Sequence, residues 1–128
     1  MSKGLLLIIM FSIFNIFSKA QVNTESEMSI STLIEEMKTN KSLVIVDVRT
    51  PGELAGPLGK IDGVINIPVQ EISTRFSELS KYKDKDIAVI CRTGNRSTFG
   101  TDFLRSKGFN AKNVLGGMVK YRNHSSKK

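Results

Sequence analysis

The chain has 128 residues, an ordinary hydrophobic content of 40% and a formal net charge of +7 at pH 7. This length allows one domain, and the composition excludes a disordered chain. The lysines are scattered rather than gathered into a block, so the charge predicts a basic surface that mildly attracts small anions and has no nucleic-acid partner.

Residues 1–20 predict a secretory signal peptide. A basic start at Lys3 precedes an apolar run from Gly4 to Phe17, and small residues follow up to Ala20. The run is shorter than the roughly 20 residues needed to span a bilayer, which favours cleavage after Ala20 over a retained membrane anchor. We therefore expect a periplasmic or secreted protein without membrane contact after cleavage.

The rest of the chain divides into three parts. We expect a polar N-terminal segment over 21–28 that frays, one folded domain over 29–123 and a polar tail over 124–128. An exported domain that relied on disulfides would have an even number of cysteines, whereas this chain has one, Cys91. A lone cysteine is by default a small buried core residue, so its role depends on its surroundings.

Strand patterns alternate with helix patterns along the domain, which predicts an α/β architecture with a parallel sheet. Thr32, followed three residues later by Glu35, predicts a capping box at the first helix. The expected elements are a helix over 32–40, strands over 43–46 and 63–68, a helix over 71–79, a strand over 87–90, a helix over 97–107 capped by Gly108, a strand over 114–115 and a short helix after Gly116 and Gly117.

The helix over 97–107 is expected to begin with Ser97 as its N-cap and to bury Phe99, Phe103 and Leu104. Three polar side chains, Asp47, Arg49 and Cys91, fall at the carboxyl ends of predicted strands. In parallel α/β sheets, ligands bind beyond these ends.

Chemistry is expected in the loop that follows the apolar strand Ile87–Ile90. A thiol at Cys91 would face the backbone N–H groups of the loop and the positive end of the next helix. Arg92 and Arg96 add two positive charges. All three influences favour the thiolate, and low-pKa cysteines occur in such electropositive settings.

Four motifs in this order resemble the rhodanese family. They are Asp47-Val48-Arg49 with Glu53, the run Gly59-Lys60-Ile61-Asp62-Gly63-Val64-Ile65-Asn66-Ile67-Pro68, the loop Cys91-Arg92-Thr93-Gly94-Asn95-Arg96-Ser97, and Gly116-Gly117-Met118. The resemblance covers roughly residues 29–123 and is greatest to single-domain thiosulfate sulfurtransferases, including small exported ones of the bacterial periplasm. It implies a parallel sheet of about five strands with helices on both faces.

Two positions depart from the family pattern. The family often has histidine where this chain has Lys60, and tryptophan where it has Tyr121. Neither position carries sulfur in the family, so we interpret both as structural substitutions.

The resemblance implies that Cys91 accepts a sulfane sulfur from thiosulfate as a persulfide and passes it to cyanide or a thiol. No metal or organic cofactor is required, and a monomer or weak homodimer is expected. Asp47 and Arg49 would support the site by orienting loops. The implied substrate-binding residues are Arg92, Thr93, Gly94, Asn95, Arg96 and Ser97.

Several alternatives stay open at this point. Arg96 could instead pair with Asp47 or Glu53, and Arg92 could simply be solvated. A cysteine-based phosphatase or arsenate reductase is disfavoured because its loop has one residue more between cysteine and arginine. A mercaptopyruvate sulfurtransferase is disfavoured by the two arginines. A persulfide carrier that delivers sulfur to a partner protein would need the same loop.

Overall fold

The structure is a computed structural model that describes residues 22–127, so the signal peptide expected over 1–20 lies outside the described residues. Among residues 22–127, no helix is long and apolar enough to cross a membrane. The elements in chain order are β1 (Glu27–Met28), α2 (Ile30–Thr39), β2 (Val44–Asp47), α3 (Pro51–Leu54), β3 (Ile65–Asn66), the 3₁₀ helix η2 (Val69–Glu71), α4 (Ile72–Arg75), the 3₁₀ helix η3 (Phe76–Tyr82), β4 (Asp86–Ile90), α5 (Asn95–Ser106), β5 (Asn110–Val114) and α6 (Gly117–Ser126).

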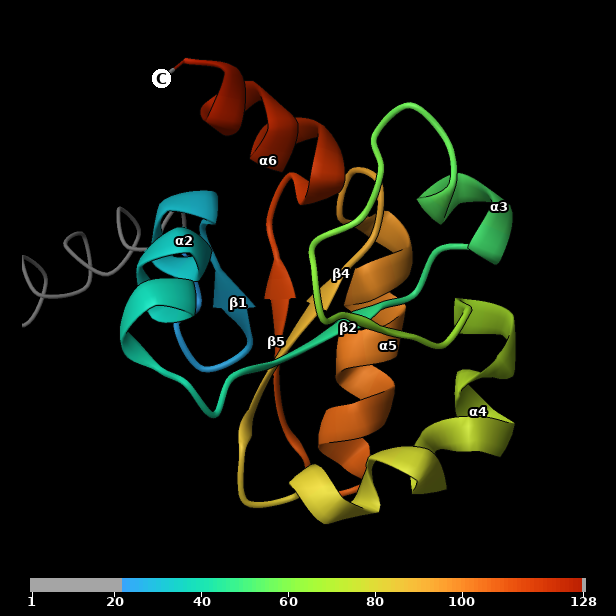
Figure 1. The fold of residues 1–128 in the computed structure, drawn as a ribbon. Helices are drawn as coiled ribbons and strands as arrows, with labels where there is room; N and C mark the ends of the chain where they lie inside the picture. Colours follow the sequence, from blue (N-terminus) through green and yellow to red (C-terminus); the bar gives the residue numbers. More distant parts are fainter. Residues whose placement is uncertain (1–21, 128) are drawn as a thin grey trace, which may run out of the picture.

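The strands form one five-stranded sheet in the order β1-β5-β4-β2-β3, and every neighbouring pair is parallel. Helices α2 and α6 pack on one face, while α4, η3 and α5 cover the other (Figure 1). The predicted α/β architecture with a five-stranded parallel sheet and helices on both faces is therefore confirmed. The central strand pair, β2 and β4, is registered from Val44 opposite Ile87 to Asp47 opposite Ile90, so both strands end together.

The burial of β4 on both faces of the sheet explains why its sequence is continuously apolar. Ile87, Val89 and the following Cys91 face the core beneath α5, whereas Ala88 and Ile90 face the core beneath α2 and α6. Because side chains alternate between the faces of a sheet and both faces are covered, each of these positions needs an apolar residue.

The folded part extends beyond the expected boundaries at both ends. Glu27 and Met28, expected to fray, form β1 and pair with Asn113 and Val114 of β5. The first helix begins earlier than predicted, because Ser29 rather than Thr32 is its N-cap and accepts a hydrogen bond from the Thr32 N–H at 3.1 Å. At the other end, α6 continues to Ser126, through most of the expected tail.

Two predictions about the helix after Cys91 are wrong. Gly94, in a left-handed conformation with φ of 113°, is the N-cap in place of Ser97, so α5 begins at Asn95. Phe99, predicted to be buried, is 60% exposed, because it lies on the side of α5 opposite the buried Ser97 and Leu104. The buried face of α5 consists of Ser97, Gly100, Thr101 and Leu104. At its end, Gly108 has φ of +90° and terminates the helix as predicted.

The remaining differences are smaller. The helix expected over 71–79 is split into η2, α4 and η3, although Ile72 and Leu79 are fully buried as predicted. The last strand is longer than expected and starts at Asn110.

Candidate functional site

Cys91 follows β4 directly and lies at the carboxyl edge of the sheet, where β2 also ends. Its side chain is 1% exposed and belongs to the core beneath α5. The chain then turns through Arg92, Thr93 and Gly94 into α5, which brings the first turn of that helix over the sulfur.

The loop directs hydrogen-bond donors at the sulfur. The Gly94 N–H donates to Cys91 Sγ at 3.1 Å, and Ser97 Oγ lies 3.2 Å from the same atom. Burial raises the pKa of the Cys91 thiol, but hydrogen bonds from the Ser97 side chain and from the N–H groups of Ser97, Gly94 and Thr93 outweigh it. The net result is a pKa below the ordinary value of a thiol, and its main causes are these short-range donors rather than the two arginines expected from the sequence.

The start of α6 fixes the orientation of the loop peptides. The N–H of Met118 donates to Cys91 O at 2.8 Å, and the N–H of Val119 donates to Arg92 O at 3.0 Å. In a trans peptide the N–H points opposite to the C=O, so anchoring the Arg92 carbonyl on α6 turns the Thr93 N–H toward the sulfur. Figure 1 shows the β4–α5 connection next to the start of α6.

This close approach requires glycine at position 117. Gly117 has φ of +56°, and a Cβ there would stand 2.5 Å from both Cys91 O and Arg92 O. The absence of a side chain at Gly117 therefore lets α6 contact the Cys91 loop.

Arg96 is held in an ion pair with Glu53. Its two terminal nitrogens each lie 2.7 Å from a Glu53 carboxylate oxygen, and both side chains are 32% exposed. Glu53 also completes a capping box with Thr50 at the start of α3. The Arg96 hydrogen bond lowers the pKa of Glu53 to about 2 against partial burial, with a further contribution from Thr50. Of the two alternatives for Arg96, the structure has the ion pair with Glu53.

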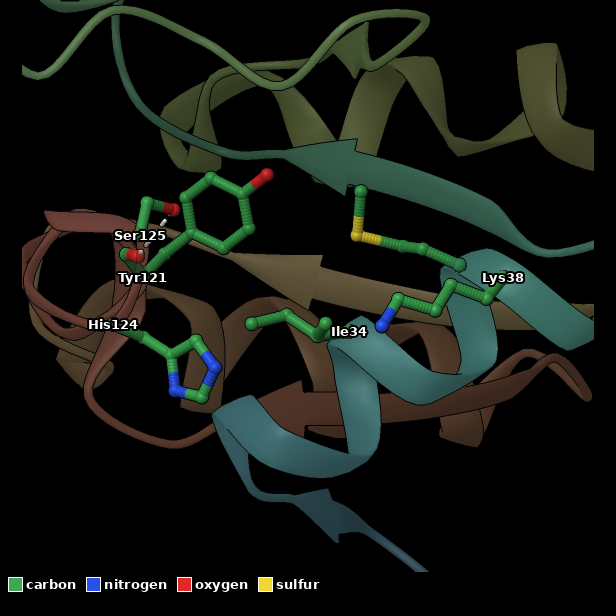
Figure 2. Close-up of a pocket in the computed structure, with 6 residues that line it drawn as sticks. Ile34, Lys38, Tyr121, His124 and Ser125 are labelled. Carbon is green, nitrogen blue, oxygen red and sulfur yellow. Dashed lines mark hydrogen bonds between the residues drawn. The ribbon is translucent and has the colours of Figure 1, made fainter. Parts of the chain in front are cut away.

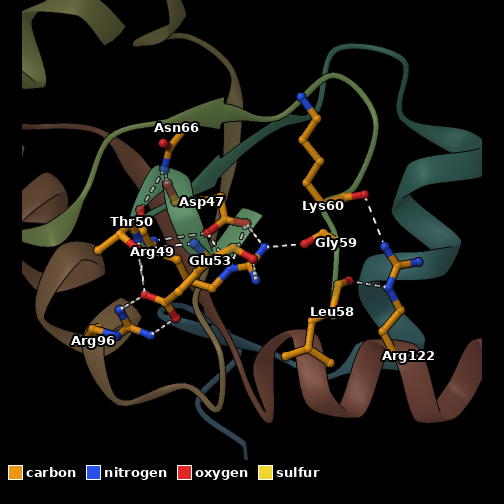
Figure 3. Close-up of polar contacts among 10 residues, drawn as sticks. All are labelled: Asp47, Arg49, Thr50, Glu53, Leu58, Gly59, Lys60, Asn66, Arg96 and Arg122. Carbon is orange, nitrogen blue, oxygen red and sulfur yellow. Dashed lines mark hydrogen bonds and ion pairs between the residues drawn. The ribbon is translucent and has the colours of Figure 1, made fainter. Parts of the chain in front are cut away.

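Asp47 and Arg49 form a buried pair behind the site. The Arg49 guanidinium donates to both carboxylate oxygens of Asp47, with the shortest contact at 2.8 Å, and the two side chains are 0% and 1% exposed. Arg49 also donates to Gly59 O at 2.7 Å, which ties the loop after α3 to the sheet. Figure 3 shows this network beside the Glu53–Arg96 pair.

A second arginine fixes the same loop from α6. Arg122 donates to Leu58 O at 2.7 Å and to Lys60 O at 3.2 Å (Figure 3). Since α6 also holds the Cys91 loop, this one helix positions both loops that flank the carboxyl edge of the sheet.

Arg92 remains as the exposed cation of the loop. It forms no ion pair within residues 22–127, and together with seven residues from the stretch between Arg49 and Leu58 it lines an open cavity of about 330 Å³. A separate cavity of about 320 Å³ lies between α2 and α6 and includes Ile34, Tyr121 and His124 (Figure 2). No residue of the Cys91 loop lines this second cavity.

The sequence-predicted residues thus occupy different places. Cys91, Gly94 and Ser97 are buried together, Arg92, Thr93 and Asn95 face solvent, and Arg96 lies between. Asn113 of β5 was not among the predicted site residues, yet it accepts a hydrogen bond from Ser97 Oγ at 2.5 Å. An asparagine within a buried strand is the signal that could have identified it, because buried amides require partners.

We expect the Glu53→Gln variant to be less stable than the native protein by about 1 kcal/mol at pH 7, after allowing for solvent screening of this partly exposed pair. The pKa of Glu53 is depressed from 4.5 to about 2, so its contribution is present above the unfolded-state pKa and is lost as pH falls toward 2. Urea unfolding across this range should show the difference between native and variant closing. Glu35→Gln, at an exposed glutamate, is the control, and a pH-independent difference for Glu53→Gln would contradict the ion pair.

The Gly117→Ala variant should be destabilised more than Gly63→Ala. Both glycines have positive φ, but a Cβ at Gly63 meets nothing within 4 Å whereas one at Gly117 strikes two loop carbonyls. Conformational strain is common to both, and the clash should add about 1–3 kcal/mol at Gly117. Thermal or urea unfolding of the two variants measures this, and equal losses would argue against the close approach of α6.

Comparison with known proteins gives the family. The rhodanese-like domain family matches residues 29–124. The chain is 30% identical over 100 residues to a sulfurtransferase of Allochromatium vinosum, covering 77% of this chain and 90% of that protein. It is 32% identical over 102 residues to YtwF of Bacillus subtilis, covering 80% and 95%.

A solved structure agrees with this assignment. The rhodanese-related protein of Thermoplasma volcanium is similar with a TM-score of 0.69 and 34% identity, over 77% of this chain and 92% of that one. The chain that places Cys91 at the end of β4, beneath the first turn of α5, is thus similar to sulfurtransferases in sequence and to a rhodanese-related protein in fold. The protein belongs to the rhodanese-like family of sulfurtransferases.

Proposed function

We propose that the protein is a thiosulfate sulfurtransferase that carries sulfur as a persulfide on Cys91. The observation that carries this proposal is the pair of donor groups next to Cys91 Sγ: the Gly94 N–H donates to the sulfur at 3.1 Å, and the Ser97 hydroxyl oxygen lies 3.2 Å from it. Such donors favour an anionic sulfur, and an ionised thiol is the nucleophilic form of cysteine.

The proposed reaction has two displacements at sulfur. The Cys91 thiolate attacks the outer sulfur of thiosulfate, the S–S bond of the donor breaks, and sulfite leaves with the bonding electron pair. A thiol or cyanide acceptor, reacting as its anion, then attacks the outer sulfur of the persulfide, and the electron pair of that S–S bond returns to Cys91. This is covalent catalysis by an activated nucleophile, and it needs no redox partner.

Arg92 is the proposed binding residue for the sulfonate group of the donor. It is exposed, lines the open cavity and is next to the nucleophile, whereas the guanidinium of Arg96 already contacts both carboxylate oxygens of Glu53. An unpaired guanidinium can bind an oxyanion without first giving up a carboxylate partner. Charge that develops on the departing sulfite would be stabilised there.

Arg92→Gln should therefore raise the KM for thiosulfate about tenfold with a smaller change in kcat, because a charge-assisted hydrogen bond to the donor is lost. Arg96→Gln should reduce stability together with any loss of rate, since it breaks the pair with Glu53. Thiocyanate formation from thiosulfate and cyanide measures the kinetics, with Cys91→Ser as the inactive control. An unchanged KM for Arg92→Gln, together with a raised KM for a fully folded Arg96→Gln, would contradict this assignment and identify Arg96 as the residue that binds the donor.

A persulfide carrier that serves a partner protein is the second candidate. Phe99 favours it, because this large apolar side chain is 60% exposed about one helical turn after Arg96, beside the loop. Aromatic residues are enriched in protein–protein interfaces relative to the rest of the surface.

Acceptor preference separates the two functions. A sulfurtransferase for small acceptors should turn over with cyanide and with small thiols, and Phe99→Ser should leave those rates unchanged because Phe99 does not contact the sulfur. Slow turnover with every small acceptor, despite rapid formation of the persulfide, would instead support the carrier. The measurement is single-turnover decay of the persulfide in the presence of each acceptor.

A further inference from the structure

Asn113 connects the Cys91 loop to the sheet through its side-chain amide. It lies in β5, is 5% exposed and was not predicted as a site residue. Its Nδ2 is 3.0 Å from Thr98 Oγ1 and 3.3 Å from Gly94 O, while its Oδ1 is 2.5 Å from Ser97 Oγ.

The partners of this amide fix its orientation. A backbone carbonyl only accepts hydrogen bonds, so the group of Asn113 that faces Gly94 O must be the NH₂. The Thr98 hydroxyl donates to the same carbonyl at 2.8 Å, which leaves its oxygen free to accept from Asn113. The oxygen of the Asn113 amide therefore faces Ser97.

This orientation determines where the Ser97 proton lies. Two oxygens 2.5 Å apart need a proton between them, and the amide oxygen of Asn113 has none, so the Ser97 hydroxyl must donate. A hydroxyl has a single proton. In this arrangement Ser97 Oγ can only accept from Cys91, 3.2 Å away, and that contact suits a protonated thiol.

The thiolate requires the opposite arrangement. An ionised Cys91 sulfur has no proton to donate, so a Ser97 oxygen that keeps its own proton on Asn113 would direct lone pairs at a negative charge. Rotation about the Ser97 C–O bond would move the proton onto the sulfur, at the cost of the hydrogen bond to Asn113. The Gly94 N–H, at 3.1 Å, serves the thiolate in either case.

We propose that the Ser97 hydroxyl proton alternates between Asn113 Oδ1 and Cys91 Sγ, and that Asn113 is a positioning residue that competes with the nucleophile for this proton. Asn113 thereby favours the neutral states of the inner sulfur, which are the thiol and the persulfide. Ser97 favours the thiolate.

Applied to sulfur transfer, this inference rests on the proposed function. When an acceptor anion attacks the outer sulfur, the persulfide S–S bond breaks and its electron pair returns to Cys91 Sγ. The Ser97 hydroxyl would then rotate from Asn113 onto this sulfur and stabilise the leaving thiolate. When the next donor transfers its sulfur, the inner sulfur becomes neutral and the hydroxyl would return to Asn113.

A substitution at Asn113 leaves the other charged groups near the thiol unchanged. Arg96 is paired with Glu53, Asp47 is paired with Arg49, and Arg92 is exposed. On α6, which packs against the loop carbonyls, Lys120 lies against Gly116 and is exposed. These groups affect the pKa of Cys91 equally in the native protein and in variants at position 113. A double-mutant cycle with Ser97 therefore isolates the part of the Asn113 effect that acts through Ser97.

The test is the pH dependence of alkylation at Cys91, the single cysteine of the chain, with iodoacetamide and the full chain. Asn113→Leu keeps the approximate shape but removes the acceptor, so Ser97 can donate to the thiolate throughout. We expect the midpoint to fall by about one pH unit, whereas Ser97→Ala should raise it by a similar amount. In the Ser97→Ala background, Asn113→Leu should have no further effect. Asn113→Ala is the second variant at this position.

A purely structural role predicts another result. If loosening of the loop were the only effect, Asn113→Leu would raise the midpoint, as Ser97→Ala does, and it would act equally in both backgrounds. Either outcome would overturn the proposal. Neither readout involves sulfur transfer, so it is independent of the proposed donor and acceptor.

A measurement on the native protein covers the case in which the variants do not fold. The NMR signal of the Asn113 side-chain carbonyl carbon should titrate with the same midpoint as alkylation of Cys91, because Asn113 Oδ1 loses its Ser97 partner when the thiolate forms. A signal that stays constant through that midpoint would refute the alternation.

Discussion

The contact between α6 and the Cys91 loop is the constraint on which the site depends. Two N–H groups of α6 hold the carbonyls of Cys91 and Arg92, and this turns the following peptide toward the sulfur. The contact is possible because Gly117 has no Cβ and adopts a positive φ. The α6 contact thereby holds the loop in the conformation that places the Gly94 N–H 3.1 Å from the buried sulfur. The packing of α6 and the environment of the Cys91 sulfur thus depend on the same backbone contact.

Four arginines near the carboxyl edge of the sheet have different roles. Arg49 and Arg96 are occupied by carboxylates, and together with Arg122 they fix the loops that flank the sheet edge. Removal of one partner from such a pair would leave the other charge uncompensated, so each pair holds its two segments together. Of Arg49, Arg92, Arg96 and Arg122, only Arg92 is exposed at this edge. The other three hold the surrounding loops in place. This arrangement suits a small anionic donor that must approach a nearly buried atom.

The sequence could predict the parallel sheet and the position of Cys91, because apolar strands and the glycine-containing loop are local patterns. It could not predict which residue caps α5, since Gly94 and Ser97 are both acceptable N-caps. It also could not predict which side of α5 faces the sheet, and that side buries Ser97 and leaves Phe99 exposed. The partners of Arg96 and Ser97 lie 43 and 16 residues away, and such pairings follow from tertiary packing.

Whether Cys91 carries sulfur is tested most directly by the intact mass of the protein before and after incubation with thiosulfate. We expect a gain of one sulfur atom that cyanide removes and that is absent from Cys91→Ala. No gain in mass from a folded protein whose Cys91 reacts readily with iodoacetamide would contradict it.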